Sequence, residues 1–168
     1  MIFALLRLAA VIWFFGFLVL SIAATSSYLY STEAAPDRAA YSAVIRDKTA
    51  ALLAAGCGLG ASMAGADEAT VQAMYRYGEA IGHAFQVLDD VLDVAGDPAW
   101  TGKPAGSDYL AGTWSSPYLN FAERGGHLPT VRSRADFPAI REKLFASGAV
   151  AASQLEASAY TQAALLEL

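Results

Sequence analysis

The sequence of 168 residues is poor in cysteine, in charged residues and in positive charge. Its single cysteine, Cys57, excludes an internal disulfide and a zinc site built from cysteines. Charged residues make up 16% of the chain, and the formal net charge of −5 excludes the basic surface with which proteins bind nucleic acid. Long internal repeats and low-complexity tracts are also absent. This length is enough for one domain with a real hydrophobic core.

Hydrophobic residues make up 55% of the chain, and part of this excess lies at the N-terminus. No charged residue occurs from Leu8 to Thr25, a run long enough to cross a bilayer as a helix. Arg7 precedes the run, and Tyr28 and Tyr30 follow it, where interfacial aromatic residues are usual. The sequence therefore predicts an apolar helix in residues 1–30, which we interpret first as a membrane span.

Three other interpretations of residues 1–30 stay open. The segment fits a signal peptide, because Arg7 precedes a long apolar region and small residues follow that region. It also fits a fully buried helix of a soluble protein, or a segment that does not belong to the fold. The expected location of the protein is accordingly membrane-associated or cytoplasmic.

Residues 31–38 form a polar linker, which Pro36 closes, and Asp37 is expected to cap the helix that follows. The remaining residues, 39–168, form the predicted folded domain. Its helices are expected at Ala39 to Ala64, Asp67 to Val94, Asp108 to Glu123 with a kink at Pro117, Phe137 to Ser147 and Gly148 to Leu166. No segment alternates as a strand does, so the predicted fold class is all-α.

Glycines mark the expected helix ends and one expected contact. Gly65 is suited to end the first helix in a left-handed conformation, and residues 96–98 (Gly-Asp-Pro) break the second. Gly56, Gly60 and Ala64 recur every four residues. On a helix they would form a smooth strip against which another helix can pack closely.

Three aspartates gather on the second predicted helix, in the segment FQVLDDVLD. Asp89 and Asp93 are four residues apart and share one helix face, which Asp90 flanks. Like charges at this spacing destabilise a free helix, so the array indicates a compensating cation. Mg²⁺ fits, because it takes few carboxylates and completes its shell with water and substrate phosphates. The alternative is an acidic face that is merely solvated.

Four more residues extend this interpretation. Gln86 lies one turn before the aspartates and points the same way. Lys48 and Thr49 lie on the first helix in RDKTAALL, and Lys103 follows the aspartates in TGKPAGSD. A lysine near bound metal and diphosphate supplies a point charge for phosphate oxygens. The sequence therefore predicts a magnesium–diphosphate site.

From about Tyr41 to its end, the chain resembles the C-terminal half of a trans-isoprenyl diphosphate synthase. The matching segments are YSAVIRDKTAALL, LGASMAGA, YGEAIGHAFQVLDDVLDVAGD and TGKPAGSD. The resemblance implies an all-α helical bundle, half of the isoprenoid synthase fold, here with an extra apolar N-terminal helix. It also implies an enzyme that uses Mg²⁺ to join an allylic diphosphate to isopentenyl diphosphate.

The resemblance implies roles for individual residues as well. The family's second aspartate-rich motif, which binds Mg²⁺, corresponds to Asp89 as principal ligand, Asp90 and Asp93. The residues near the diphosphate and the allylic group correspond to Lys48, Thr49, Gln86 and Lys103.

The chain also departs from the family. The first aspartate-rich motif does not occur in the sequence, nor do the N-terminal residues that bind isopentenyl diphosphate. Thr113 stands where the family has a lysine, and Ser115, Ser116 and Pro117 replace the usual Thr-Leu-Pro. With half of a two-sided clamp, the chain is expected to hold magnesium–diphosphate weakly.

These observations leave three hypotheses about function. In the first, the chain is a prenyltransferase half that becomes catalytic when a partner in a homo- or hetero-oligomer supplies the first motif. Alternatively, it is a non-catalytic relative, a regulatory subunit or a remnant, with or without a membrane tether. The third alternative is an unrelated membrane-anchored helical protein whose acidic face binds cations incidentally.

Overall fold

The structure is a computed structural model that describes residues 37–168. Every regular element in this range is helical, which confirms the predicted all-α class for these residues. In chain order they are α2 (Arg38–Ile45), η1 (Arg46–Ala50), α3 (Ala51–Met63), α4 (Glu68–Ala95), α5 (Pro98–Thr101), α6 (Ser107–Ala111), α7 (Ser116–Glu123), α8 (Phe137–Ala146) and α9 (Ala149–Leu165).

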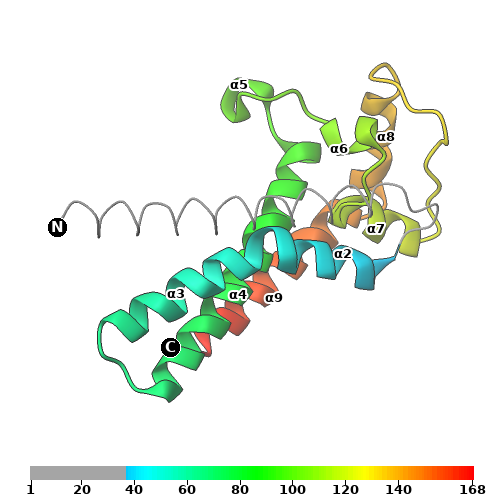
Figure 1. The fold of residues 1–168 in the computed structure, drawn as a ribbon. Helices are drawn as coiled ribbons and strands as arrows, with labels where there is room; N and C mark the ends of the chain where they lie inside the picture. The colour runs from blue at the N-terminus through cyan, green and yellow to red at the C-terminus, as the bar shows by residue number, and fades with distance from the viewer. Residues whose placement is uncertain (1–36) are drawn as a thin grey trace.

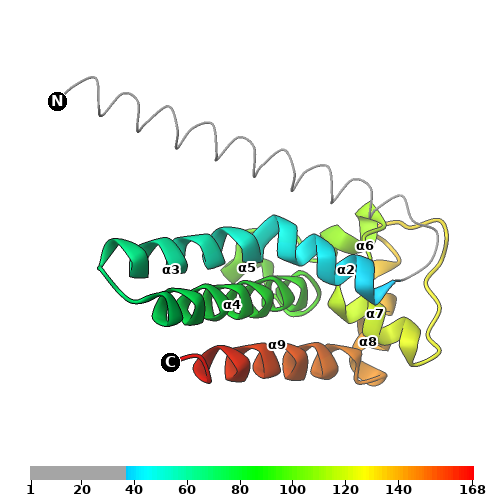
Figure 2. The same cartoon turned by 60° about the horizontal axis from the view of Figure 1, so that its bottom comes forward.

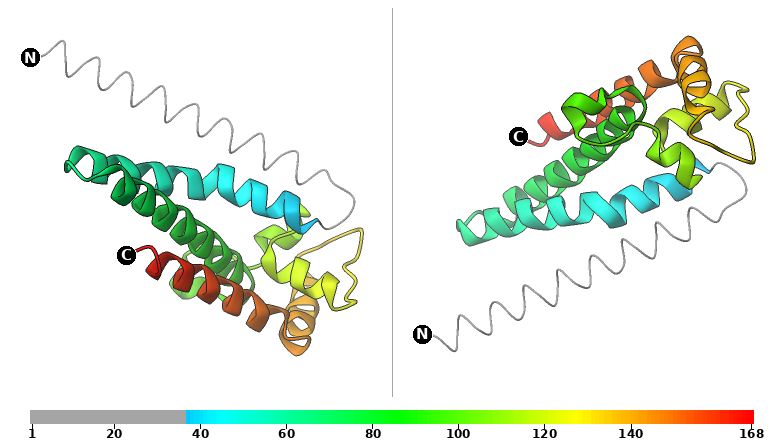
Figure 3. Two further views of the ribbon diagram at one scale, coloured as in Figure 1. Left: turned by 90° about the horizontal axis from the view of Figure 1, so that it is seen from below. Right: turned by 90° about the horizontal axis from the view of Figure 1, so that it is seen from above.

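Three long rods form the body of the domain. The first rod is the continuous run of α2, η1 and α3, and α4 lies between α3 and α9 (Figure 2). The shorter helices α6, α7 and α8 gather at the end of the rods where α2 begins (Figures 1 and 3). The C-terminal part of α4 therefore lies among most of the elements of the fold.

Helix α4 is the central rod, and local signals in the sequence define both of its ends. Asp67 caps it by accepting a hydrogen bond from the backbone N–H of Thr70 at 2.8 Å. Gly96 ends it, close to the predicted end at Val94. Its buried face, which includes Val87 and Val91, contributes to both hydrophobic clusters of the domain.

The first rod contains a π-helical turn, η1, that the sequence did not predict. The buried positions are Tyr41 and Ile45 on α2, Ala50 in η1, and Ala54 and Gly58 on α3. They follow one another at intervals of four residues, except that five residues separate Ile45 from Ala50. The wider turn takes up this extra residue, so one buried stripe continues along the whole rod.

The strip of Gly56, Gly60 and Ala64 is not the one that α4 packs against. All three residues are exposed in the described structure, and no atom lies within 4 Å of where a Cβ of Gly56 or Gly60 would stand. The first rod and α4 approach each other closely at glycines of α4 instead. A Cβ on Gly82 would lie 2.4 Å from the Cα of Ala50, and one on Gly78 would lie 2.5 Å from the carbonyl oxygen of Leu53.

We expect Gly82→Ala to lower the free energy of unfolding by about 1–3 kcal/mol, because the added methyl overlaps the backbone of η1. The control is Gly60→Ala, which meets open space and should stabilise the helix by about 0.5–1 kcal/mol. Urea denaturation measures both changes. Equal stability of the two variants would contradict the assigned packing face.

The predicted single helix from Asp108 to Glu123 is wrong. Gly112 ends α6 with a φ of +79°, and α7 begins only at Ser116. Pro117 lies in the first turn of α7, where its missing N–H leaves no helical hydrogen bond unmade, so it starts a helix instead of kinking one. The segment between the second and third predicted helices also contains the short helix α5.

The other predicted boundaries agree with the structure. Gly65 has a φ of +78°, as expected for a left-handed helix end. Asp37 caps α2 by accepting a hydrogen bond from the backbone N–H of Ala39 at 2.9 Å. The predicted apolar helix of residues 1–30 lies outside the described residues. Within residues 37–168, no helix is both long and apolar enough to cross a membrane.

Candidate functional site

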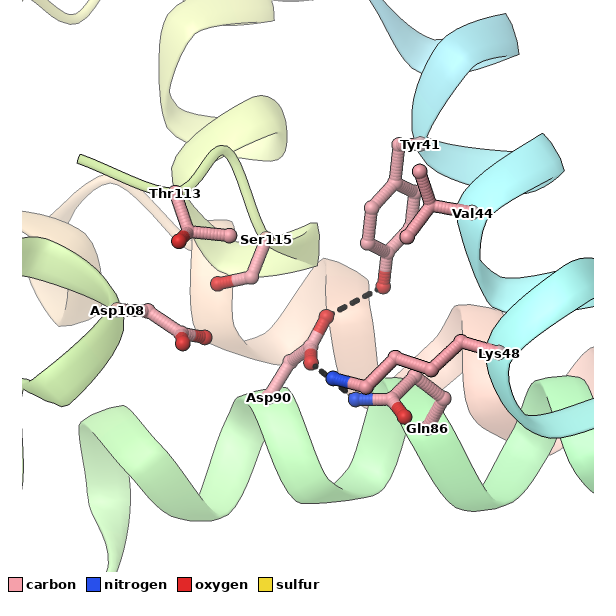
Figure 4. Close-up of a pocket in the computed structure, with 8 residues that line it drawn as sticks. All are labelled: Tyr41, Val44, Lys48, Gln86, Asp90, Asp108, Thr113 and Ser115. Carbon is pink, nitrogen blue, oxygen red and sulfur yellow. Dashed lines mark hydrogen bonds between the residues drawn. The ribbon is translucent and has the colours of Figure 1, made fainter. Parts of the chain in front are cut away.

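The predicted site residues gather around a hollow of about 310 Å³ at the C-terminal part of α4. Six of the seven line it: Lys48, Gln86, Asp89, Asp90, Asp93 and Lys103. The seventh, Thr49, lies beside them and donates a hydrogen bond to Gln86. A second hollow of about 120 Å³ shares four lining residues with the first, and Figure 4 shows its walls. Residues far apart in the sequence therefore converge on one region of the fold.

Asp89 is the aspartate of the array that faces solvent. Its side chain is exposed on the wall of the larger hollow. Among residues 37–168, no group makes a hydrogen bond or an ion pair with its carboxylate. Both of its oxygens are therefore available to a ligand in the hollow.

Asp90 points into the protein instead, and its residue is only 4% exposed. Its Oδ2 accepts hydrogen bonds from the hydroxyl of Tyr41 and, at 3.1 Å, from the backbone N–H of Ser116. Its Oδ1 accepts one from Nε2 of Gln86 at 3.0 Å (Figure 4). Burial raises the pKa of Asp90 to about 6, against the opposing effect of these hydrogen bonds.

Asp93 holds the start of α6. Its Oδ1 accepts a hydrogen bond from the backbone N–H of Ser107 at 2.9 Å, and its Oδ2 accepts one from that of Asp108 at 3.1 Å. Its backbone oxygen accepts a third from Gly106 at 2.8 Å. Burial raises the pKa of Asp93 as well. These contacts tie the loop that carries Lys103 to α4.

The three aspartates of the motif thus have different partners, although all three line the larger hollow. Among residues 37–168, no three His, Cys, Asp or Glu side chains are grouped so that they could hold a metal ion. Mg²⁺ does not require such a cage, because it binds through one or two carboxylates, water and phosphate oxygens. The exposed carboxylate of Asp89 fits that requirement. Coordination by Asp90 and Asp93 stays a prediction.

Gln86 links the first rod to α4. Its Oε1 accepts a hydrogen bond from Oγ1 of Thr49 at 2.8 Å, while its Nε2 donates to Asp90. Thr49 lies on the π-helical turn η1, next to Lys48. The widened turn therefore places both predicted residues of η1 at the hollow.

Two lysines supply the positive charge of the larger hollow. Lys48 comes from η1 and Lys103 from the loop after α5, and both line the hollow. Neither forms an ion pair within residues 37–168. Four carboxylates, those of Asp89, Asp90, Asp93 and Asp108, line the same space. This mixture suits a cation and an anion together, such as a metal diphosphate, better than a free anion.

Asp108 belongs to the site, although no role was predicted for it. It lines both hollows. Burial, reinforced by the negative charges of Asp90 and Asp93, raises the pKa of Asp108 to about 7. Tyr41 and Ser116 are likewise unpredicted partners of the site. Spacing along the chain carries no signal for them, because they meet Asp90 only through tertiary packing.

Comparisons with known proteins identify the family of this chain. The family model of polyprenyl synthetase matches residues 26–130. Heptaprenyl diphosphate synthase component 2 of Geobacillus stearothermophilus is 51% identical over 75 residues, which cover 45% of this chain and 23% of that protein. A short chain isoprenyl diphosphate synthase of Methanothermobacter thermautotrophicus is 35% identical over 127 residues, or 76% of this chain and 39% of that protein.

Solved structures match over more of the chain. The polyprenyl synthase of Caulobacter crescentus CB15, crystallised with calcium and isoprenyl diphosphate, is 33% identical with a TM-score of 0.82. The match covers 89% of this chain and 49% of that one. The chain thus spans about half the length of this structure and less of the curated relatives. The family match and the shared half-fold set aside the hypothesis of an unrelated helical protein: the chain belongs to the polyprenyl synthetase family.

Proposed function

We propose that residues 37–168 form one wall of a magnesium-dependent prenyltransferase site, the wall that holds the diphosphate of an allylic substrate. One observation carries this proposal. The free carboxylate of Asp89 and two lysines without ion pairs, Lys48 and Lys103, line a single hollow. A carboxylate suits Mg²⁺, and the two ammonium groups suit the phosphate oxygens that would complete its shell.

Each residue then has a defined task. Asp89 would hold Mg²⁺, and Lys48 and Lys103 would contact the oxygens of the diphosphate. Gln86, fixed between Thr49 and Asp90, would form the side of the hollow near the allylic group. When bound, Mg²⁺ stabilises the negative charge that grows on a departing pyrophosphate.

Apolar side chains are exposed beside the hollow, which supports the view that another protein segment completes the site. Phe85, Leu88 and Leu92 flank Asp89 on the same helix, and they are 61%, 46% and 52% exposed within the described structure. A contiguous apolar surface beside a charged hollow is typical of a face that another protein segment covers. The match to half of the Caulobacter crescentus enzyme points the same way.

We therefore infer that coupling requires a first aspartate-rich motif from outside residues 37–168. The name of the Geobacillus stearothermophilus relative, component 2, denotes one component of an enzyme and favours a second, different chain as its source. A homo-oligomer that builds the site from identical chains is the alternative assembly.

A non-catalytic role is the second candidate, and Thr113 favours it. Thr113 lines the smaller hollow together with Asp90 and Asp108, and it brings no positive charge there. Among the described residues, Lys48 is the one cationic side chain that lines this smaller hollow. A small positive charge at this hollow fits a regulatory subunit that binds magnesium–diphosphate without transferring a prenyl group.

The test is an assay of the full chain with farnesyl diphosphate, isopentenyl diphosphate and Mg²⁺. We expect no elongated product from the chain alone, and product after addition of a chain that carries the first aspartate-rich motif. The non-catalytic alternative predicts calorimetric binding of magnesium pyrophosphate and no product with any such partner. Absence of any Mg²⁺-dependent pyrophosphate binding would contradict both versions.

A further inference from the structure

We propose that Asp90 is a positioning residue and not a metal ligand: with Tyr41 it forms a buried clamp that holds Gln86 and Thr49 in place. The clamp is defined by four residues, Tyr41, Thr49, Gln86 and Asp90. The inference deepens the proposed function, on which it rests, by dividing the aspartate motif into a binding residue, Asp89, and a residue that shapes the wall.

The hydrogen bonds of Asp90 leave little room for a metal. A carboxylate offers about four lone-pair directions, and three of them are already used. Its donors are the hydroxyl of Tyr41, the backbone N–H of Ser116 and the side-chain amide of Gln86. Mg²⁺ at a bonding distance of about 2.0–2.1 Å would be confined to the one remaining direction, on a residue that is only 4% exposed.

The three donors come from three different elements. Tyr41 lies on α2, Gln86 on α4 and Ser116 at the start of α7. Asp90 is therefore the point where these three helices are joined by side-chain contacts. Removal of its carboxylate would leave buried donors without partners, which costs more than the loss of the bonds alone.

Gln86 connects the clamp to Lys48, a candidate diphosphate-binding residue. The amide of Gln86 donates to Asp90 at 3.0 Å, and its oxygen accepts from Thr49 at 2.8 Å. Both ends of this side chain are therefore fixed. Thr49 is adjacent to Lys48 on the π-helical turn, so the clamp also holds the turn that presents a lysine to the hollow.

The far side of the clamp is anchored as well. Ser116, whose N–H reaches Asp90, donates through its hydroxyl to Ser153 or Glu156, each at 2.8 Å. Glu156 in turn accepts hydrogen bonds from Arg38 at 3.2 Å. A chain of polar contacts thus runs from the first residue of α2 through α9 and α7 to Asp90. Such a network holds its members in one arrangement only while every member is satisfied.

A charge-neutral exchange of side chains tests the clamp. Asp90→Asn sets an amide against the amide of Gln86, and we expect the affinity for magnesium pyrophosphate to fall about tenfold. Adding Gln86→Glu restores one donor and one acceptor with their roles exchanged. We expect the double variant to bind within about threefold of the original protein, since the pair acts as a unit.

Calorimetry over a series of Mg²⁺ concentrations separates the clamp from a ligand role. A positioning residue changes pyrophosphate affinity and leaves the Mg²⁺ concentration for half-saturation unchanged. The proposal is overturned if Asp90→Asn raises that Mg²⁺ concentration as much as Asp89→Asn does and Gln86→Glu fails to rescue it.

A ligand-free measurement decides the clamp even if the proposed function fails. In the ¹⁵N-labelled full chain without Mg²⁺, the side-chain amide signal of Gln86 is identified by its loss in Gln86→Glu. We expect Tyr41→Phe and Asp90→Asn to shift this signal, because both disturb the acceptor of the amide. The control Tyr75→Phe removes a hydroxyl that makes no hydrogen bond among residues 37–168, and should leave it in place. An unshifted signal in Tyr41→Phe would refute the clamp.

Discussion

Replacement of Asp89 by asparagine is expected to weaken Mg²⁺-dependent pyrophosphate binding about a hundredfold, equivalent to about 3 kcal/mol. The reason is that Asp89 alone among the three motif aspartates has a carboxylate with no partner within residues 37–168. The fold should not suffer. Asp89 is exposed, and loss of its charge relieves repulsion from Asp93, one turn away on the same helix.

The measurement is calorimetric titration of the full chain with pyrophosphate at several fixed Mg²⁺ concentrations. Glu142→Gln is the matched control, because it removes the same charge from an exposed helical position that lines neither hollow. We expect the control to bind as the original protein does. If Asp89→Asn bound as tightly as this control, the assignment of Asp89 as the metal ligand would be wrong.

The second large effect concerns pH and Asp108. Burial and the charges of Asp90 and Asp93 raise the pKa of Asp108 from 3.8 to about 7, a change that Lys48 only partly offsets. Below pH 3.8 the carboxyl is protonated in both folded and unfolded chains. Between pH 3.8 and 7 the unfolded chain releases the proton while the folded chain keeps it. The free energy of unfolding therefore falls over this interval by about 2–4 kcal/mol.

Asp108→Asn removes this titration, because an amide is neutral at every pH. We expect the variant to equal the original protein in stability at pH 4 and to exceed it by about 2–4 kcal/mol at pH 8. Asp90, whose pKa is also raised, contributes in the same direction and leaves a smaller dependence in the variant.

Urea denaturation at pH 4, 6 and 8 measures the difference. Glu142→Gln serves again as the control, since it removes a carboxylate from an exposed position that lines neither hollow. If the free energy of unfolding depended on pH equally in Asp108→Asn and in the original protein, Asp108 would not be the source of the pH dependence.

The position of Asp90 illustrates what the spacing of a motif can and cannot predict. The spacing of the motif correctly placed Asp89, Asp90 and Asp93 on one helix. The same helix buries Val87, Val91 and Val94, and Asp90 lies within that stripe because it is three residues from Val87 and four from Val94. A signal for an inward-pointing aspartate was therefore present. Its partners were not visible, since Tyr41 is 49 residues away in the chain and Ser116 is 26 away.

Local signals determined the secondary structure of most of the domain. The predicted helix start at Asp67, the left-handed Gly65 and the break after Val94 placed the end of α3 and both ends of α4 nearly to the residue, because caps and breaks act over a few residues. The sequence by itself also determined the all-α class of the described residues.

Only the tertiary structure decided which faces meet. It selected the stripe of Ala50, Ala54 and Gly58 over the equally small Gly56 and Gly60, because Gly78 and Gly82 of α4 must lie against a backbone that approaches closely. It introduced the π-helical turn that brings Thr49 to Gln86, and it turned Asp90 toward Tyr41 while Asp89 stayed exposed. These outcomes depend on contacts between residues distant in the chain, and no spacing along one helix encodes them.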